Sequence, residues 1–339
     1  ASYSKIAKLT AADAAASDKF GISVAIDGGT IVVAAYNDGN NGNNWTGSGS
    51  VYVFRSSDGW STYTEIKLTA SDAAASDIFG WSMAFDGTTI VVGAPHDGND
   101  GQLGGSVYVF RTTDGGGSYN QVDKLTVADG HNFGTSVAID GDTLVAGASY
   151  VHHGGMADAG AAYVFRTSDG GASYDEVAQL TAADADAKDY FGIEVAIDGS
   201  TIVVGAWKDD DGGSDSGSAY LFRTTDGGAT YAQMAKLTAP DADAGDVFGY
   251  NVAIDGATVV VSAEWDGDAG SKSGSAYVFA IASEVLTDAT IYDAVDAWLT
   301  DAAAAESTYG HISTWDTSQV TNMAELFCAP GQGCSHDHA

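Results

Sequence analysis

Residues 79–94 decide how this chain folds: Phe79-Gly-Trp-Ser-Met-Ala-Phe-Asp-Gly-Thr-Thr-Ile-Val-Val-Gly-Ala94. Asp86-Gly87 is a dipeptide that favours a two-residue hairpin turn, because both central positions of that turn need a positive φ. The β-branched run Ile90-Val91-Val92 after the turn is typical of a strand that is buried on both faces. The stretch therefore predicts two short antiparallel strands joined by a tight turn.

This hairpin is repeated along the chain. Phe-Gly recurs at residues 20, 79, 133, 191 and 248, so the spacings are 59, 54, 58 and 57 residues. A period of this length indicates a propeller or a solenoid. In the second copy the hairpin is followed by a loop, an alternating strand over 105–110, a glycine-rich turn and another strand over 119–125. Four antiparallel strands are the content of one propeller blade.

The two ends of the repeat region indicate how a ring would close. The fifth copy stops after its third strand, Ser275 to Phe279, whereas the chain begins with a stretch, Tyr3 to Leu9, that matches the fourth strand of the other copies. Pairing of these two segments would complete the fifth blade and leave no open sheet edge. We therefore expect an all-β fold, a five-bladed β-propeller of four-stranded blades over residues 1–281 that is closed by the N-terminal strand. The alternative is an open solenoid.

The charge of the chain limits its partners. It has 46 acidic and 13 basic residues, a net charge of −33. Such a surface disfavours nucleic acid and anionic membranes and favours divalent cations and cationic groups, although solubility in a salty medium is the other explanation. No apolar run reaches the ~18 residues that a membrane helix needs, and no signal-peptide pattern opens the chain. We expect a soluble, mature or trimmed chain with no membrane insertion.

Phe-Gly followed by Gly93-Ala94-Pro95 resembles the FG-GAP repeat of integrin α-chain propellers and of secreted microbial and algal proteins. The resemblance covers residues 1–281 and implies a propeller used for adhesion or ligand binding at the cell surface. Its partner would then be an extracellular protein or a glycan. Integrin-type repeats carry a calcium loop between their first two strands, but here that connection is only a turn such as Asp86-Gly87. A two-residue turn cannot wrap a calcium ion, so those calcium sites are not expected here.

A second glycine-rich turn follows the third strand of four copies. It has the pattern Ser/Thr-x-Asp-Gly and resembles the Asp-box of sialidase-type propellers. Its aspartates are Asp58, Asp114, Asp169 and Asp226. An aspartate in such a turn caps backbone N–H groups while the glycines take left-handed conformations, so we expect a structural role. No protease or nucleophile motif is present, and we expect no enzymatic activity.

Aspartates gather in the linkers between repeats and in the loops between second and third strands. In a four-stranded propeller these segments share one face. Carboxylates interleaved with Gly and Asn suit Ca²⁺, and the predicted ligands are Asp209, Asp211 and Asp215, followed by Asp97, Asp100, Asp266, Asp268 and Asp38. The alternative is a solvated acidic rim.

Aromatic residues in or beside the same loops suggest a second function. Tyr36, Trp207 and Trp265 could stack on the apolar faces of sugars, although such residues also serve packing. The main hypothesis is a non-enzymatic extracellular or cell-surface adhesion and assembly module that binds calcium, and the alternative is a carbohydrate-binding lectin.

Asn44-Trp45-Thr46 is the one glycosylation sequon, so Asn44 is the expected glycan acceptor.

The tail over 282–339 has a different pattern. Apolar residues at helical spacing predict an amphipathic helix over about Asp288 to Ala304. Residues 309–327 resemble one unit of the BspA-like repeat of surface proteins. A single repeat unit cannot bury its own face, so we expect the tail to mediate self-assembly or contacts with following domains. Cys328 and Cys334 lie close together and are a candidate disulfide.

Overall fold

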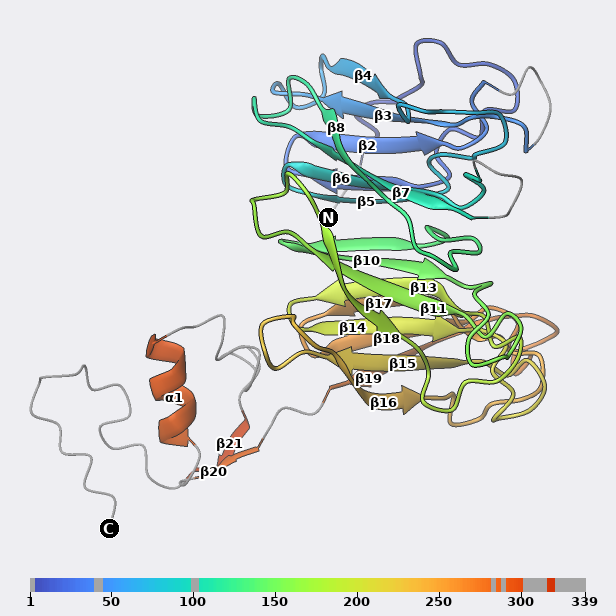
Figure 1. Ribbon diagram of the computed structural model, residues 1–339, viewed down its shortest axis with the longest axis vertical. Coiled ribbons are helices and arrows are strands. Elements are labelled where there is room, and N and C mark those ends of the chain that lie inside the picture. Colours follow the sequence, from blue (N-terminus) through green and yellow to red (C-terminus); the bar gives the residue numbers. More distant parts are fainter. Residues whose placement is uncertain are drawn as a thin grey trace, which may run out of the picture.

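The computed structural model describes residues 4–39, 45–98, 104–281, 285–287, 291–300 and 316–320. Five antiparallel sheets follow one another along the chain, one for each repeat (Figure 1). The first four sheets have four strands each, and the fifth has three among the described residues. The all-β architecture predicted from the repeats is confirmed.

The strands have similar lengths in every repeat. They are β1 (Val24–Asp27), β2 (Thr30–Ala35), β3 (Ser50–Arg55), β4 (Thr64–Leu68), β5 (Ser82–Asp86), β6 (Thr89–Ala94), β7 (Ser106–Arg111), β8 (Asn120–Leu125), β9 (Val137–Asp140), β10 (Thr143–Ala148), β11 (Ala161–Arg166), β12 (Asp175–Leu180), β13 (Phe191–Asp198), β14 (Thr201–Ala206), β15 (Ser218–Arg223), β16 (Ala232–Leu237), β17 (Phe248–Asp255), β18 (Thr258–Ala263) and β19 (Ser275–Ala280).

The hairpin turn lies one residue later than predicted. Asp86 pairs with Thr89 across the hairpin, so the two central residues are Gly87 and Thr88. Only Gly87 takes a positive φ, of 56°. The prediction that both central positions need a positive φ is therefore wrong, and one glycine at the first central position is sufficient.

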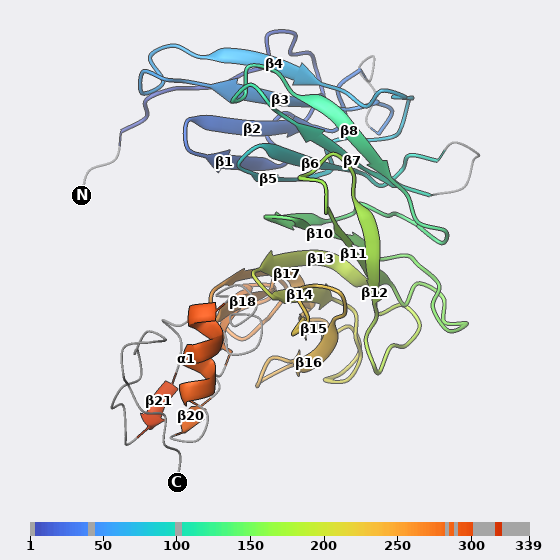
Figure 2. The ribbon, with the colours of Figure 1, turned by 60° about the vertical axis from the view of Figure 1, so that its left-hand side comes forward.

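The first strand of each sheet lies beside the first strands of the neighbouring sheets. β1 contacts β5, β5 contacts β9, β9 contacts β13, and β13 contacts β17. The successive sheets are thus arranged like the blades of a propeller, with each first strand on the inside (Figure 2). The fold is consistent with a five-bladed propeller.

The Phe-Gly dipeptide forms the joint between two blades. Gly105, just before the third strand of one blade, forms a parallel bridge with Phe133 of the next, and three other blade pairs have the same bridge. Gly105 has a φ of 100°, and a Cβ there would lie only 2.3 Å from the Phe133 carbonyl oxygen. Phe133 is fully buried and meets the Tyr163 ring edge-on, with 5.7 Å between the ring centroids. Only glycine therefore permits this close approach of the two backbones.

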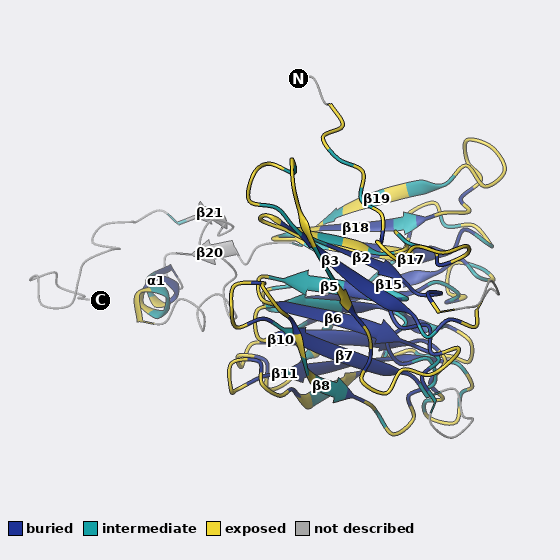
Figure 3. Ribbon diagram, turned by 90° about the horizontal axis from the view of Figure 1, so that it is seen from above, coloured by how far each residue is buried: buried dark blue, intermediate teal, exposed yellow. Residues whose placement is uncertain are grey.

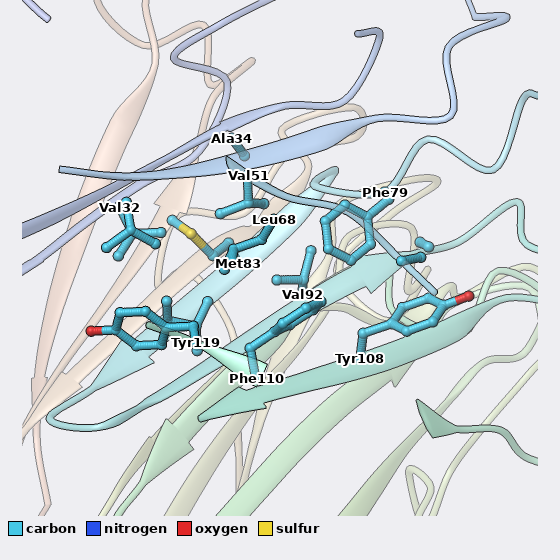
Figure 4. Close-up of a cluster of buried hydrophobic side chains, with 14 residues drawn as sticks. Val32, Ala34, Val51, Leu68, Phe79, Met83, Val92, Tyr108, Phe110 and Tyr119 are labelled. Atoms are coloured by element: carbon cyan, nitrogen blue, oxygen red, sulfur yellow. The ribbon is translucent and has the colours of Figure 1, made fainter. Parts of the chain in front are cut away.

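The hydrophobic core lies between the blades. Val32 and Val51 of the first blade share a cluster with Met83 and Val92 of the second (Figure 4). Equivalent clusters join the second blade to the third, the third to the fourth, and the fourth to the fifth. Each buried aliphatic side chain contributes about 1.5–3 kcal/mol, so the stacking of blades is a main source of stability.

The structure does not show the predicted closure by the N-terminal strand. Residues 4–10 form no strand, and β19 pairs only with β18 among the described residues. Val278 on β19 is 70% exposed, whereas its counterparts Val53 and Val109 are fully buried. Val24 on β1 is likewise 66% exposed, although its counterparts in the other blades are buried. Figure 3 shows exposed residues along β19.

The tail contains two short strands and one helix in its described part. β20 (Val285–Thr287) pairs in parallel with β21 (Asp316–Gln319). Helix α1 (Ile291–Thr300) buries Ile291, Ala294 and Val295. The predicted helix is confirmed over these ten residues. Cys328 and Cys334 lie outside the described residues, and the BspA-like resemblance stays a prediction. No helix in the described part of the chain is long and apolar enough to cross a membrane.

Candidate functional site

We call the surface built by the interblade linkers and the loops between second and third strands the linker–loop face. Its linkers are residues 10–19, 69–78, 126–132, 181–190 and 238–247, and its loops are 36–39, 45–49, 95–98, 104–105, 149–160, 207–217 and 264–274. In four of the five blades one tyrosine hydroxyl lies within hydrogen-bond distance of both an aspartate of the linker and an aspartate of the loop. The prediction that linkers and loops share one face is therefore confirmed.

A cluster of one tyrosine, two aspartates and one lysine recurs on this face. In the second blade the Tyr108 hydroxyl lies 2.6 Å from Asp97 Oδ2 and 2.8 Å from Asp72 Oδ1. Lys124 Nζ lies 2.5 Å from Asp72 and 2.8 Å from Asp97. The tyrosine comes from the third strand, the lysine from the fourth, and the aspartates from the linker and the loop. The first blade repeats the cluster with Tyr52, Asp13, Asp38 and Lys67, and the fourth blade with Tyr220, Asp184, Asp209 and Lys236.

Charge pairing fixes the ionisation of each cluster. Burial raises the pKa of Tyr108, and its two aspartate partners raise it further, so the hydroxyl remains a donor. Burial opposes the charge of Lys124, but hydrogen bonds to Asp72 and Asp97 outweigh it and raise the lysine pKa. Burial likewise works against the ionised Asp72, and the bonds from Lys124 and Tyr108 still lower its pKa. Each cluster is thus one ammonium group between two carboxylates.

The third and fifth blades depart from this pattern. In the third blade Val151 stands at the position of the loop aspartate and Gln179 at that of the lysine. In the fifth blade Tyr277 donates to Asp241 and Asp266 at 2.8 and 3.0 Å. No ion pair joins these two aspartates to a lysine within the described part of the chain. The fifth blade therefore holds an uncompensated pair of carboxylates.

The best-assembled carboxylates on this face belong to the fourth blade. One carboxylate oxygen from each of Asp184, Asp209 and Asp211 lies within 4.8 Å of the other two. Lys236 Nζ contacts all three, at 2.8, 2.8 and 2.5 Å. Ca²⁺ takes six to eight oxygen ligands, and an ammonium group here occupies the position between the carboxylates. The arrangement therefore fits a bound ammonium group better than a calcium ion.

The structure brings the predicted calcium ligands together only in part. Asp209 and Asp211 share the cluster just described, but Asp215 faces Lys208 at 3.9 Å instead. Asp184 completes the cluster from the preceding linker, and sequence reasoning missed it as a partner.

The remaining predicted ligands are divided among other blades. Asp38 and Asp97 are paired with lysines of their own blades. Asp266 accepts from Tyr277, while Asp268 is exposed. Asp100 lies outside the described residues, as does the sequon residue Asn44. Among the described residues, Asp184, Asp209 and Asp211 are the one group of three carboxylates close enough to share a metal ion, and calcium binding stays a prediction.

The aromatic residues proposed for sugar stacking contact other side chains. Tyr36 is buried, with the rings of Trp45 and Trp81 each 5.3 Å away. Trp207 has Lys208 Nζ 4.7 Å from its ring centroid. Trp265 is partly exposed, but Lys272 Nζ lies 3.7 Å from its ring centroid. Packing and cation–π contacts thus use much of the aromatic surface that a lectin site would need.

The Asp-box-like turns have the predicted structural role. Asp114 Oδ1 accepts from the backbone N–H groups of Gly117 and Ser118 at 2.8 and 3.0 Å. It also accepts from the Thr112 hydroxyl at 2.8 Å. Hydrogen bonds from Ser118 and Thr112 hold the pKa of Asp114 well below its usual range. The turns lie at the opposite end of the strands from the linker–loop face, and we call that surface the turn face.

Comparisons with solved structures give weak similarities. Sqt1 of Saccharomyces cerevisiae has 12% identity and a TM-score of 0.36, over 56% of this chain and 43% of that one. The sialidase of Trypanosoma rangeli, in complex with sialic acid, has 10% identity and a TM-score of 0.41, over 73% of this chain and 44% of that one. The match thus spans less than half the length of either protein. No curated protein matches the chain.

The family comparison is informative. The FG-GAP repeat matches five stretches, residues 3–54, 63–110, 119–165, 174–222 and 231–279. Each of the last four stretches holds a fourth strand followed by the first three strands of the next blade, whereas the first stretch holds only β1, β2 and β3 as strands. Because the five stretches cover well over half of the sequence, the chain belongs to the FG-GAP repeat family.

Proposed function

We propose that this chain is a non-enzymatic extracellular binding module that holds a lysine-rich protein surface against its linker–loop face. FG-GAP propellers typically serve as binding modules of extracellular proteins. The observation that supports the proposal is the recurring cluster, in which two carboxylates and a tyrosine hydroxyl surround one lysine of the chain itself. Exposed aspartates of this face, such as Asp186, Asp243 and Asp268, are available for lysines of a partner.

Binding to a lysine-rich peptide tests this function. The variant Asp186→Asn/Asp243→Asn/Asp268→Asn removes three exposed charges from the linker–loop face. We expect it to bind an immobilised oligolysine peptide at least tenfold more weakly than the parent. The matched control, Asp142→Asn/Asp175→Asn/Asp255→Asn, removes three charges from the turn face and should bind like the parent. Equal losses in both variants would mean that net charge alone attracts the peptide.

Calcium binding and lectin activity stay predictions. Calcium at the fourth blade would have to compete with Lys236, so we expect added calcium to raise the melting temperature no more than NaCl of equal ionic strength. A larger rise of the melting temperature with calcium than with NaCl would support the predicted calcium site. A glycan array tests the lectin alternative, and binding that depends on Trp265 would favour it over protein adhesion.

We also propose that the ring closes through the N-terminal segment. The family match begins at Tyr3 in the first copy, in phase with Tyr63 and its counterparts that open the other four. Ala7-Lys8-Leu9 then corresponds to Ala235-Lys236-Leu237. Pairing with β19 would bring Lys8 to the uncompensated Asp241 and Asp266, and it would complete the fifth cluster. It would also cover the exposed Val278.

Self-assembly through the tail is a further part of the proposal. Helix α1 buries Ile291 and Val295 on one side while Leu299 is 55% exposed. A docking tail on a propeller suits head-to-tail contacts between copies.

A further inference from the structure

The residues that follow the five Phe-Gly dipeptides line one cavity on the inner side of the blades. Its volume is about 270 Å³, and every repeat contributes to its wall. The lining residues are Ile22, Ser23, Trp81, Ser82, Met83, Thr135, Ser136, Val137, Ile193, Glu194, Tyr250 and Asn251. We call this space the axial cavity. A site to which all five repeats contribute can exist only in the assembled fold.

Among the described residues, Glu194 is the only charged side chain that lines the axial cavity. It lies on β13, is largely buried, and forms a hydrogen bond with the Ser136 side chain of the neighbouring blade. Burial raises the pKa of Glu194 to about 7, and the Ser136 bond opposes this only in part. Tyr250 of β17 is the other titratable group in the wall, and Glu264 acts on Tyr250 from beyond β18. No lysine, arginine or histidine lines the cavity among the described residues.

Two aromatic rings stand in the same wall as this carboxyl group. Trp81 comes from the second blade and Tyr250 from the fifth. Aromatic rings attract organic cations through their π faces, most strongly where water is excluded. The other wall residues include hydroxyl and amide groups that can bind a polar substituent, such as Ser23 and Asn251. A carboxylate, aromatic rings and a few polar groups are the features that recognise a small ammonium ion.

We propose that the axial cavity binds a small organic cation of the alkylammonium class, with Glu194 as its counter-charge and Trp81 and Tyr250 as its aromatic walls. The volume suits a ligand of a few heavy atoms. The strongly negative field of the chain, with its net charge of −33, raises the local concentration of such a cation. The site adjoins the linker–loop face, because Trp81 contacts the rings of Tyr36 and Trp45 and Tyr250 contacts the ring of Trp207.

Calorimetric titration with choline tests the proposal. Choline should bind the full chain at about pH 8.5, and about thirtyfold more weakly at about pH 5.5, because only a few per cent of Glu194 is then ionised. Binding near pH 6.5 should release a proton, measured as a dependence of the heat on the ionisation enthalpy of the buffer. Exposed aspartates, with a usual pKa near 4, would release none at this pH.

Matched variants identify the carboxyl group. Glu194→Gln keeps the shape of the side chain and should lose choline binding and proton release. Glu176→Gln, which removes an exposed glutamate on β12, should keep both. The melting temperature of each variant verifies folding. Binding that survives Glu194→Gln, or no binding to the parent at about 10 mM choline, would overturn the proposal.

Discussion

Gln179 Nε2 donates a hydrogen bond to the Tyr163 hydroxyl at 3.2 Å, at the position where three other blades place a lysine. The same blade has Val151 at the position of the loop aspartate. One positive and one negative charge are thus absent together. This pairing indicates that the lysine of each complete cluster is held mainly to neutralise the buried loop aspartate.

Loss of that lysine should therefore destabilise a complete cluster. In Lys124→Gln, Asp97 would keep a charge that is almost fully buried, with 4% of its side chain exposed. We expect a loss of about 2–4 kcal/mol in the free energy of unfolding. The double variant Lys124→Gln/Asp97→Val copies the third blade and should regain most of that loss in urea denaturation. A double variant less stable than Lys124→Gln would show that Asp97 has another role.

The Phe-Gly joint predicts a severe effect of one added methyl group. Gly105→Ala would place Cβ 2.3 Å from the Phe133 carbonyl oxygen, so the two blades must separate. Gly115→Ala is the matched control, because Gly115 also has a positive φ, 74°, but has open space around it. We expect the control to lose about 1–2 kcal/mol and Gly105→Ala to lose several kcal/mol more by thermal or urea unfolding. Similar losses would mean that backbone strain, and not blade contact, sets the cost.

Because burial raises the pKa of Glu194, we expect the stability of the chain to depend on pH. The pKa of Glu194 is about 7 in the folded chain against 4.5 in the unfolded one, because burial disfavours the charge. Between these values the folded chain holds a proton that the unfolded chain releases, so stability falls as pH rises through this window. Asp189, with its pKa raised to about 6 mainly by burial, acts in the same direction. Melting temperatures from pH 4.5 to 7 should therefore fall less steeply in Glu194→Gln, and parallel profiles would contradict the assignment.

The repeat period allowed much of the fold to be predicted from the sequence. The regular recurrence of Phe-Gly predicted the blades. Its physical reason is that the phenylalanine of each Phe-Gly from the second copy on pairs with a glycine of the preceding blade. The ion pairs were harder to predict. Lys236 and Asp184 are 52 residues apart, so a single loop gives no sign of the lysine that pairs with its aspartates. Taken one at a time, the aspartate-rich loops therefore resembled calcium-binding loops. A lysine two residues before the linker does recur in phase in four of the five copies, and that was the available signal.

The axial cavity could not be predicted from any single repeat. Its wall takes different residues from each copy, such as Trp81, Glu194 and Asn251, at the two positions after Phe-Gly, where the repeats differ. The periodic pattern explains the scaffold, whereas this site arises from departures from the pattern.

The tail should be dispensable for the propeller. Residues 282–339 follow the last strand of the fifth blade, and β20 pairs with β21 of the tail itself. Deletion of 282–339 should leave a chain that unfolds cooperatively and is monomeric by analytical ultracentrifugation, while the full chain associates as its concentration rises. A full chain that stays monomeric would exclude assembly through the tail, and a truncated chain that unfolds would make the tail a part of the propeller.

Closure of the ring is tested most directly by a disulfide between the N-terminal segment and β19. Leu221 pairs with Ala235 in the fourth blade, so the same register places Ala7 opposite Val278. In a chain with Cys328→Ser and Cys334→Ser, the pair Ala7→Cys/Val278→Cys should form a disulfide within one monomer under mild oxidation. The control Ala7→Cys/Val122→Cys, with the second cysteine on β8, should not. A closed ring predicts the intramolecular crosslink in high yield, whereas crosslinks only between chains, or none, would contradict closure by the N-terminal strand.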